Sequence, residues 1–438
     1  MTNTMREVLE FLEENEVKFI KLGFCDPFGA QKNLCIMADR LPSAFEEGVS
    51  FDGSAIRGFQ DVVRSDLLLF PDPATLTVLP WRPGPGRVVR FYCDIKKPDG
   101  TPFSHDSRYL LKQAMDRCAR MGYVCRLGAE CEFYLFKTDE DGQPTAQPLD
   151  RGGYLDISPL DKGENVRRDI CLCLEEMGIR PESSHHEQGP GQNEIDFMFS
   201  DPLTSADNLL TFKSVVKAVA AQNGLFASFM PKPLEKTAGS GLHVNLSLAQ
   251  NGLNIFKNEK DEHSHVAESF IAGILARVPE MTLLLNPLAN SYRRFGEFEA
   301  PGYVSWSHQN RSQLVRIPAA MGDKVRMELR SPDPSLNPYL AFAAILSAGL
   351  DGIERNLPLP RSANVDLFTA DRAVTDDLIP LPKNLMDAIS LAADSAFLRD
   401  VIGAELLEKL LAAKRAEFQS LSAGDDIEAH RQMYFTVT

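Results

Sequence analysis

Two glutamates one residue apart, Glu130 and Glu132, interrupt the otherwise apolar segment LGAECEFYLF (127–136). In an extended chain the side chains at i and i+2 point to the same side, so the two carboxylates share one face of a predicted strand. They then lie roughly 6–7 Å apart. At that distance two negative charges repel by on the order of 2 kcal/mol at an effective dielectric constant near 20, and burial increases the penalty. The segment therefore predicts a positively charged partner close by.

The same alternation of apolar and chemically active residues occurs in three further segments, 193–199, 241–248 and 325–331. Each reads as a strand that is apolar on one face and functional on the other. The functional faces carry Glu194 and Asp196, then His243, Asn245 and Ser247, then Arg326, Glu328 and Arg330. If these strands are neighbours in one sheet, their polar faces form a single charged cavity.

The acidic and imidazole side chains point to metal binding. With Glu187 added, the set holds five carboxylates and one imidazole: Glu130, Glu132, Glu187, Glu194, Glu328 and His243. Oxygen-rich ligand sets select hard divalent ions, Mg²⁺ or Mn²⁺, over zinc. Six ligands suit two ions that keep open positions for substrate oxygens. Taken singly, each glutamate is better explained by an exposed face or an ion pair, and His243 by a hydrogen-bonded core position; the repetition across several strands favours the metal site.

Arginines supply the complementary charge. The segment 290–318 and the strand that follows it contain Arg293, Arg294, Arg311, Arg316, Arg326 and Arg330. Planar guanidinium groups bind carboxylates and phosphates through paired hydrogen bonds, so metals and arginines together predict a polyanion such as a nucleoside triphosphate. One or two of these arginines are expected to be ordinary surface charges. The sequence has no G-x-x-x-x-G-K-[ST] loop and no dinucleotide-binding G-x-G-x-x-G after a strand.

Composition excludes other classes of protein. The chain has 438 residues and a net charge of −15, so it lacks the basic surplus that non-specific nucleic-acid binding requires. Its eight cysteines all lie between Cys25 and Cys173 without a C-x-x-C pair, a pattern typical of free thiols in a reducing compartment. No segment approaches the ~18 consecutive apolar residues of a membrane span. We therefore expect a cytoplasmic protein without nucleic-acid or membrane partners.

The order of predicted elements indicates two domains. The first hundred residues contain short strand patterns after an amphipathic N-terminal helix, and the turn-forming residues near Pro98 and Gly100 end this part. Long helical patterns begin at about Ser107 and alternate with strands. We predict an α+β protein with a small β-rich domain (1–104) and a larger catalytic domain (105–438). The acidic, proline-rich stretch 357–382 reads as a surface loop.

Several longer motifs occur in a specific order: FDGSAIRGFQDVVRSD, ECEF, HHEQGPGQNEID, FMPKP followed by GSGLHVNLSL, NRSQLVRIP, and RMELRSPDPSLNPYLAF. In this combination the chain resembles bacterial type I glutamine synthetase over nearly its whole length. The resemblance implies a β-grasp-like N-terminal domain and a catalytic domain with a curved antiparallel sheet and surrounding helices. It also implies a homo-oligomer, a dodecamer of two stacked hexameric rings with active sites between neighbouring subunits.

The activity that the resemblance implies is ATP-dependent ligation of ammonia to the γ-carboxylate of L-glutamate. ATP phosphorylates that carboxylate, and ammonia attacks the resulting γ-glutamyl phosphate to give L-glutamine, ADP and phosphate. Such a site needs anions that bind ammonium and one base that takes its proton. The co-substrate is ATP, and the implied cofactors are two or more Mg²⁺ or Mn²⁺ ions per site.

Matching motif to motif assigns the residues to roles. One metal ion would be held by Glu132, Glu187 and Glu194, and the other by Glu130, His243 and Glu328. Glutamate would be bound by Arg294, Arg330 and the backbone near Gly239. ATP would be bound by Arg311, Arg316 and Arg326 at the phosphates, with Arg311 also catalytic, and by Glu182 and Ser247 near the nucleoside. Ammonium would be bound by Asp52, Tyr154, Glu187 and Glu299, with Asp52 as the base and Glu299 on a flap that shields the intermediate from water.

The chain departs from the family pattern at several positions. Ala55 stands where the family's DGSS motif has a second serine, and the flap is one residue shorter before Glu299 than in the enterobacterial pattern. The chain has no tyrosine between Tyr339 and Tyr434, so adenylylation of the loop at 364–371 is not expected. The feedback arginine of some Gram-positive relatives falls at Asp61, which argues against that control as well.

Two alternative functions remain on the sequence alone. A γ-glutamyl-amine ligase would share the metal and ATP sites but replace the ammonium pocket; Asp52, Tyr154 and Glu299 argue against it, whereas Ala55 leaves it open. A non-catalytic member of the same fold would be expected to lose metal ligands or arginines, and none of these is missing here.

Overall fold

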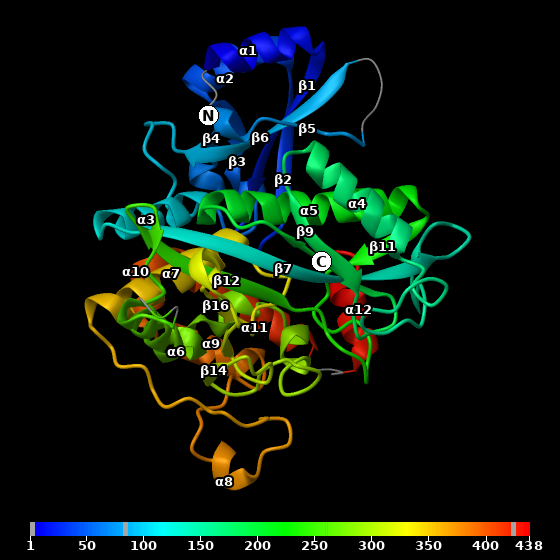
Figure 1. Ribbon diagram of the computed structural model, residues 1–438. Coiled ribbons are helices and arrows are strands. Elements are labelled where there is room, and N and C mark those ends of the chain that lie inside the picture. Colours follow the sequence, from blue (N-terminus) through cyan, green and yellow to red (C-terminus); the bar gives the residue numbers. More distant parts are fainter. Residues whose placement is uncertain (1–4, 82–85, 259, 261, 422–425) are drawn as a thin grey trace.

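The computed structural model describes residues 5–81, 86–258, 260, 262–421 and 426–438. Two sheets organise the chain, a small one in the N-terminal part and a large curved one in the remainder, with helices packed on both (Figure 1). This arrangement confirms the predicted α+β class. Among the described residues, no helix combines the length and apolar character needed to span a membrane.

The N-terminal sheet has the order β2-β1-β6-β4-β3, with β5 paired to β6. Its strands are β1 (Val17–Cys25), β2 (Gln31–Met37), β3 (Val49–Asp52), β4 (Asp66–Pro71), β5 (Thr77–Val78) and β6 (Arg87–Lys96). Strand β1 runs parallel to β6, and the other pairs are antiparallel. The helices α1 (Met5–Glu14) and α2 (Leu41–Glu47) bury apolar side chains such as Val8 and Leu41 against this sheet. Strand β3, which ends at Asp52, is one that the sequence patterns did not indicate.

The catalytic sheet has ten strands with the order β14-β15-β16-β12-β7-β10-β9, and β8, β11 and β13 pair at its margins. The strands are β7 (Val124–Thr138), β8 (Pro144–Pro148), β9 (Pro181–His186), β10 (Gln192–Phe197), β11 (Leu225–Ser228), β12 (Leu242–Gln250), β13 (Leu253–Asn254), β14 (Trp306–His308), β15 (Val315–Ile317) and β16 (Met327–Leu329). Apart from the parallel pair β14 and β15, the pairs are antiparallel. The four segments with alternating patterns are therefore adjacent, which confirms the condition for a common cavity.

Helices pack around the catalytic sheet and bury its apolar side chains. They are α3 (Ser107–Arg120), α4 (Glu164–Glu176), α5 (Pro202–Gln222), α6 (His265–Leu285), α7 (Pro338–Glu354), α9 (Leu385–Ala393), α10 (Ala396–Ile402), α11 (Ala404–Leu421) and α12 (Ile427–Tyr434). Phe133 of β7 packs against Phe212 of α5, with ring centroids 6.0 Å apart. Because Cys131 and Phe133 are fully buried in this core, Glu130 and Glu132 must point the other way.

The stretch predicted to be a surface loop extends away from the body of the molecule and contains only the short helix α8 (Arg372–Thr375) (Figure 1). Its first part is fastened to the segment around β14. The Trp306 indole donates to the Pro360 carbonyl at 2.7 Å, and Asn310 donates to the Val365 carbonyl at 2.8 Å.

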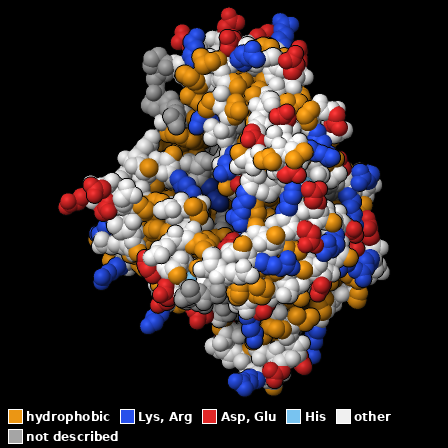
Figure 2. Space-filling model, turned by 180° about the vertical axis from the view of Figure 1, so that it is seen from behind, with side chains coloured by type: hydrophobic (Ala, Val, Ile, Leu, Met, Phe, Trp, Pro, Cys, Tyr) orange, Lys and Arg blue, Asp and Glu red, His pale blue; other side chains and the backbone are white. Residues whose placement is uncertain are grey.

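All eight cysteines are free, as predicted. On the face seen in Figure 2, acidic and basic side chains are interspersed over the surface of both parts of the chain.

One buried arginine joins the two parts of the chain. Arg108 of α3 pairs with Asp72 and Asp94 of the N-terminal part at 2.9 and 2.7 Å and with Asp207 of α5 at 3.1 Å. Tyr339 of α7 also donates to Asp207. A guanidinium with three carboxylate partners fixes the N-terminal sheet against the catalytic helices.

We expect Arg108→Met to lower the free energy of unfolding by roughly 3–5 kcal/mol, because it leaves three partly buried carboxylates without their common cation. Urea denaturation of the purified protein measures this. The matched control is Lys112→Met, which removes a half-buried partner of the same Asp94 and should change stability by less than about 1 kcal/mol. Equal effects of the two substitutions would contradict a special role for Arg108.

Candidate active site

Strand register brings the acidic residues together. Glu130 and Glu132 of β7 lie opposite Asp196 and Glu194 of β10, respectively. On its other side, Glu130 lies opposite His243 of β12. Further along the sheet, Glu328 of β16 is opposite Asn245 of β12 and Arg316 of β15. Five consecutive strands thus present charged side chains at one level of the sheet.

These side chains line a cavity of about 830 Å³. Thirteen residues that the sequence selected contribute to its wall: Glu130, Glu132, Tyr154, Glu187, Glu194, Gly239, His243, Arg294, Glu299, Arg311, Arg316, Arg326 and Arg330. Glu328 lies directly behind the wall as the partner of Arg316 and Arg330. Carboxylates and guanidinium groups therefore face one common space.

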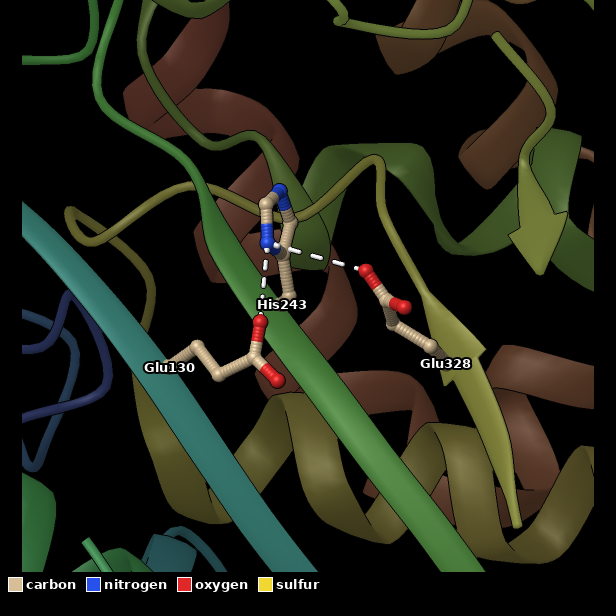
Figure 3. Close-up of side chains that lie close together, drawn as sticks. All are labelled: Glu130, His243 and Glu328. Carbon is tan, nitrogen blue, oxygen red and sulfur yellow. Dashed lines mark hydrogen bonds and ion pairs between the residues drawn. The ribbon is translucent and has the colours of Figure 1, made fainter. Parts of the chain in front are cut away.

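His243 lies between two carboxylates that come from different strands (Figure 3). Its Nδ1 atom is 3.3 Å from Glu130 Oε2 and 3.8 Å from Glu328 Oε1. Asn245, two residues along β12, donates to Glu130 Oε1 at 2.8 Å and accepts from Arg326 Nε at 2.8 Å. Burial opposes ionisation of Glu130, but the hydrogen bonds from His243 and Asn245 lower its pKa to about 2. Arg326, whose charge also lowers the pKa of Glu130, is a positively charged side chain beside the paired glutamates.

The neighbouring carboxylates are held under strong mutual repulsion. Burial, together with the charge of Glu187, raises the pKa of Glu132 to about 7. The pKa of Glu194 is raised well above its ordinary value by burial and by the charges of Asp196 and Glu132. Glu132 accepts hydrogen bonds from Gln192 at 2.8 Å and from the Gly241 amide at 2.9 Å. A bound cation would strongly stabilise the ionised form of these carboxylates.

Two arginines hold the deepest carboxylate. Arg316 donates to Glu328 Oε2 at 2.5 Å, and Arg330 donates to Glu328 Oε1. Burial would raise the pKa of Glu328, but Arg330, His243 and Arg316 together lower it. Glu328 is therefore charged, although its side chain is only 1 % exposed.

The ligand set fits divalent cations. Donor atoms of Glu130, His243 and Glu328 lie within 4.8 Å of one another, as do those of His185, Glu187 and Glu194. Both groups are rich in oxygen, which matches Mg²⁺ or Mn²⁺ better than zinc. The structure adds His185 to the second group, where the sequence pointed to Glu132.

Arg294 lies beside the glycines of the neighbouring loop. Its two terminal nitrogens donate to the Ser331 and Arg330 carbonyls at 2.7 and 2.9 Å. A Cβ atom at Gly239 would come within 2.5 Å of the Pro231 carbonyl and 3.0 Å of Arg294, so only glycine fits there. Arg294 therefore shapes the wall of the cavity in which the Gly239 backbone is exposed to a ligand.

A buried ion pair supports the loop that carries Tyr154. Asp150 accepts from His186 Nε2 and from the amides of Gly152 and Lys162, at 2.9, 3.2 and 2.9 Å. His186 Nδ1 donates to the Glu187 carbonyl at 2.7 Å, since a carbonyl can only accept. Both ring nitrogens are therefore donors, and the ring fixes the Tyr154 loop and the Glu187 backbone at once.

Tyr154 and His185 form the entrance beside Glu187. Their rings meet edge to face with centroids 5.4 Å apart, and His185 is 2.9 Å from Glu187 Oε1. The hydrogen bond with Glu187 raises the pKa of His185. On the opposite side, Gln188 donates to Glu299 Oε1 at 3.2 Å. The predicted ammonium-binding residues Tyr154, Glu187 and Glu299 thus lie around one part of the cavity.

A second cavity of about 410 Å³ adjoins the first and shares Glu130, Ser183, Asp196 and Arg326 with it. Glu182 and Ser247, the two residues predicted to lie near the nucleoside, both line this second cavity. Its wall also contains Phe197 and Phe199. The arrangement places an apolar hollow next to the predicted phosphate region.

Asp52 lies apart from the other predicted site residues, which line the two cavities or, like Glu328, lie directly behind their wall. It is exposed at the end of β3, and its carboxylate accepts from the Ser54 hydroxyl at 2.6 Å and the Ser54 amide at 2.9 Å. These hydrogen bonds lower the pKa of Asp52. Within one copy of the chain Asp52 is not brought to the cavity.

The residues of the cavity wall that sequence reasoning missed include His185, Gln188, Gln192 and Phe298. The first three lie within the quoted motif HHEQGPGQNEID, and His185 shares the face of Glu187 by the same i and i+2 rule. Phe298 carried no such signal. It belongs to an irregular segment where Phe298 and Glu299 have φ angles of +46° and +63°.

Comparison with known proteins agrees with this architecture. Residues 104–431 match the family model "Glutamine synthetase, catalytic domain", and residues 16–98 match "Glutamine synthetase, beta-Grasp domain". A glutamine synthetase of Clostridium saccharobutylicum is 46% identical over 420 residues, covering 95% of each chain. One of Methanosarcina mazei is 45% identical over 425 residues, covering 96% of this chain and 95% of the relative. The solved structure titled "GmaS/ADP complex-Conformation 1" superimposes with a TM-score of 0.87 at 31% identity and covers 99% of both chains.

The fold and the charged cavity define an ATP-dependent ligase that joins a carboxylate to an amine. The chain belongs to the glutamine synthetase family, whose members form glutamine from glutamate and ammonia with ATP.

We expect the stability of the metal-free protein to fall as pH rises from about 5 to 8. The pKa of Glu132 is raised from 4.5 to about 7 on folding, so its stabilising contribution is complete below about pH 4.5 and is lost as pH passes 7. Mg²⁺ or Mn²⁺ should therefore raise the melting temperature more at pH 8 than at pH 6, because the ligands must be deprotonated. Differential scanning fluorimetry measures both effects.

Glu132→Gln should make the stability of the metal-free protein less dependent on pH. It should also reduce the rise in melting temperature that Mg²⁺ or Mn²⁺ causes. The control Glu354→Gln changes a half-exposed carboxylate on α7, outside the cavity, and should leave both unchanged. A metal-induced shift of equal size in wild-type protein and Glu132→Gln would contradict Glu132 as a contributor to the cation site.

Proposed function

We propose that the chain is of the bacterial type I subtype and that it makes glutamine through γ-glutamyl phosphate in the cavity described above. The observation that carries the proposal is that one cavity combines two groups of oxygen and imidazole ligands with five arginines that line the same space. Carboxylates alone would suit many cation sites. The addition of the arginines creates a site for a phosphate chain and an amino-acid carboxylate together.

We assign Glu132, Glu187 and Glu194, with His185 beside them, to one divalent ion and Glu130, His243 and Glu328 to the other. When bound, Mg²⁺ or Mn²⁺ supplies positive charge for the oxygens of the transferred phosphoryl group. Arg311, Arg316 and Arg326 line the cavity, and Arg326 also lines the second hollow. These three arginines would contact the phosphates of ATP. The hollow containing Glu182 and Ser247 would then hold the nucleoside.

Glutamate would lie between Arg330 and the Gly239 backbone, with its γ-carboxylate toward the phosphates. Arg294 buttresses this position through the Arg330 and Ser331 carbonyls. A developing acyl phosphate would be stabilised by guanidinium groups that are already fixed, so no reorganisation is needed at the moment of transfer.

Ammonium would be bound by the negative charges of Glu187 and Glu299 and by the Tyr154 ring and hydroxyl. Deprotonation requires a base beside this pocket, and the role falls to Asp52. Because Asp52 is exposed and lies outside the cavity of its own chain, we infer that it serves the cavity of a neighbouring copy. The proposal therefore includes a homo-oligomer, a dodecamer of two hexameric rings, with each site completed by a second subunit.

The remaining assignments are consistent with this reading. We propose a domain boundary at residues 104–105, between β6 and α3, and a cytoplasmic location where ATP and glutamate are available and thiols stay reduced. The segment around α8 contains no tyrosine, so control by tyrosine adenylylation there is not expected. A second candidate activity, ligation of a small alkylamine, is favoured by one observation, the loss of a hydroxyl at Ala55.

We expect glutamate-dependent and Mg²⁺-dependent release of phosphate from ATP to be greatest with ammonium as the acceptor. The assay compares ammonium, methylamine, ethanolamine and a polyamine at equal concentration and identifies each product by mass spectrometry. Glutamine as the main product supports the proposal. A γ-glutamyl-alkylamide formed faster than glutamine would establish the second candidate instead.

We expect Asp52→Asn to reduce glutamine formation by roughly 100-fold or more, since general-base catalysis contributes about 10²–10⁴-fold. Formation of the acyl phosphate, measured by trapping with hydroxylamine, should fall much less. Asp61→Asn, on the segment that follows β3, is the matched control. Its rates of glutamine formation and of acyl-phosphate formation should be close to those of the wild type. Equal loss of both half-reactions in Asp52→Asn would exclude its role as the base.

A further inference from the structure

A buried lysine outside the predicted site contacts two irregular segments of the cavity wall. Lys232 lies in the loop between β11 and β12, and its side chain is 5 % exposed. Its ammonium group is 4.6 Å from the centroid of the Phe298 ring and donates to the Thr237 carbonyl at 2.5 Å. Neither the ion ligands nor the phosphate-binding arginines account for a cation at this position.

The backbone of Lys232 is rigidly placed. The Lys232 amide donates to the Asn290 side chain at 2.7 Å, and the Asn290 amide group donates back to the Lys232 carbonyl at 3.0 Å. Asn290 is fully buried. The Lys232 side chain therefore starts from a fixed backbone position. Its ammonium group can hold neighbouring segments that have no regular secondary structure.

The first segment held by Lys232 is the flap, residues 297–300. Phe298 and Glu299 adopt left-handed backbone conformations, which non-glycine residues rarely do and which need support from their surroundings. The Phe298 ring is 44% exposed, and Lys232 provides a cation at its face. Glu297, with an oxygen 3.9 Å from the ammonium group, adds a second contact from the same flap.

The second segment is 237–239, which ends at the glycine assigned to glutamate binding. Lys232 holds the Thr237 carbonyl, and Tyr134 donates to the next carbonyl, that of Ala238, at 2.5 Å. Gln192 donates to the Gly239 carbonyl at 3.2 Å. The position of Gly239 and the position of the flap thus depend on the same ammonium group.

We propose that Lys232 is a positioning residue that ties the flap to the glutamate-binding loop through Phe298. By holding Phe298, it keeps Glu299 over the cavity, where water must be excluded while ammonia attacks the acyl phosphate. The inference rests on the proposed function for its catalytic consequence. The contact between the two segments does not depend on that function.

The first test measures coupling between ATP hydrolysis and amide formation. In Phe298→Leu and in Lys232→Met, phosphate released per glutamine formed should rise about three- to tenfold at limiting ammonium. KM for ATP should stay within about twofold of wild type, because the phosphate-binding arginines are unaffected. Phe298→Tyr keeps an aromatic face for the Lys232 ammonium group. Its ratio of phosphate released to glutamine formed should therefore stay close to that of the wild type.

The double variant Lys232→Met/Phe298→Leu should be no worse than either single variant if the two residues act as one unit. Lys217→Met and Phe368→Leu are matched controls. Lys217 is a partly buried lysine of α5 with its ammonium group 5.9 Å from the Phe229 ring, and Phe368 is a partly exposed phenylalanine near α8. Multiplicative effects in the double variant, or unchanged coupling in Phe298→Leu, would overturn the proposal.

A second measurement does not need turnover. Hydrogen–deuterium exchange of peptides covering 295–301 and 237–241 should be faster in Phe298→Leu and Lys232→Met than in wild type, and unchanged in Lys217→Met. Equal exchange in all variants overturns the tie between the segments. A wild-type protein that forms no glutamine would overturn the proposed function, whereas faster exchange in the two variants would still support the tie.

Discussion

Electrostatic repulsion among carboxylates on adjacent strands is the constraint on which the structure depends. Glu132 and Glu194 face each other across the pair β7 and β10, and Glu130 lies one step along the same strand as Glu132. The protein relieves only part of this repulsion. His243 stabilises the charge on Glu130, whereas burial leaves Glu132 with a pKa near 7. A bound cation would relieve the remaining repulsion, which is the physical basis of the proposed ion and phosphate binding.

Much of the surrounding structure can be understood as support for that cluster. The apolar faces of the strands pack on α5 and the helices below the sheet, so the carboxylates cannot turn away from the cavity. The Asp150 and His186 pair fixes the backbone of Glu187, and Arg108 fixes the N-terminal sheet against the catalytic helices. Rigid support of this kind lets charged groups act without reorganising when substrate binds.

The opposite wall of the cavity is less regular. Arg311 is 52% exposed, and Glu299 lies in a strained segment held by Lys232, Gln188 and Arg330. A rigid sheet on one side and a supported flap on the other is an arrangement suited to admitting substrates and then excluding water. Asp52, by contrast, is exposed and lies outside this cavity within one copy of the chain.

The sequence by itself determined which residues share a face, because the period-2 alternation of a strand is a local property of the chain. It therefore predicted the paired glutamates of β7, the polar face of β12 and the α+β class, and its ordered motifs indicated the family. Only the tertiary structure decided which strands are neighbours, that Arg316 and Arg330 both hold Glu328, and that Lys232 meets Phe298. Apart from Arg330 and Glu328, which are two residues apart in the chain, those contacts join separate segments of the chain, where packing and burial rather than local periodicity fix the partners.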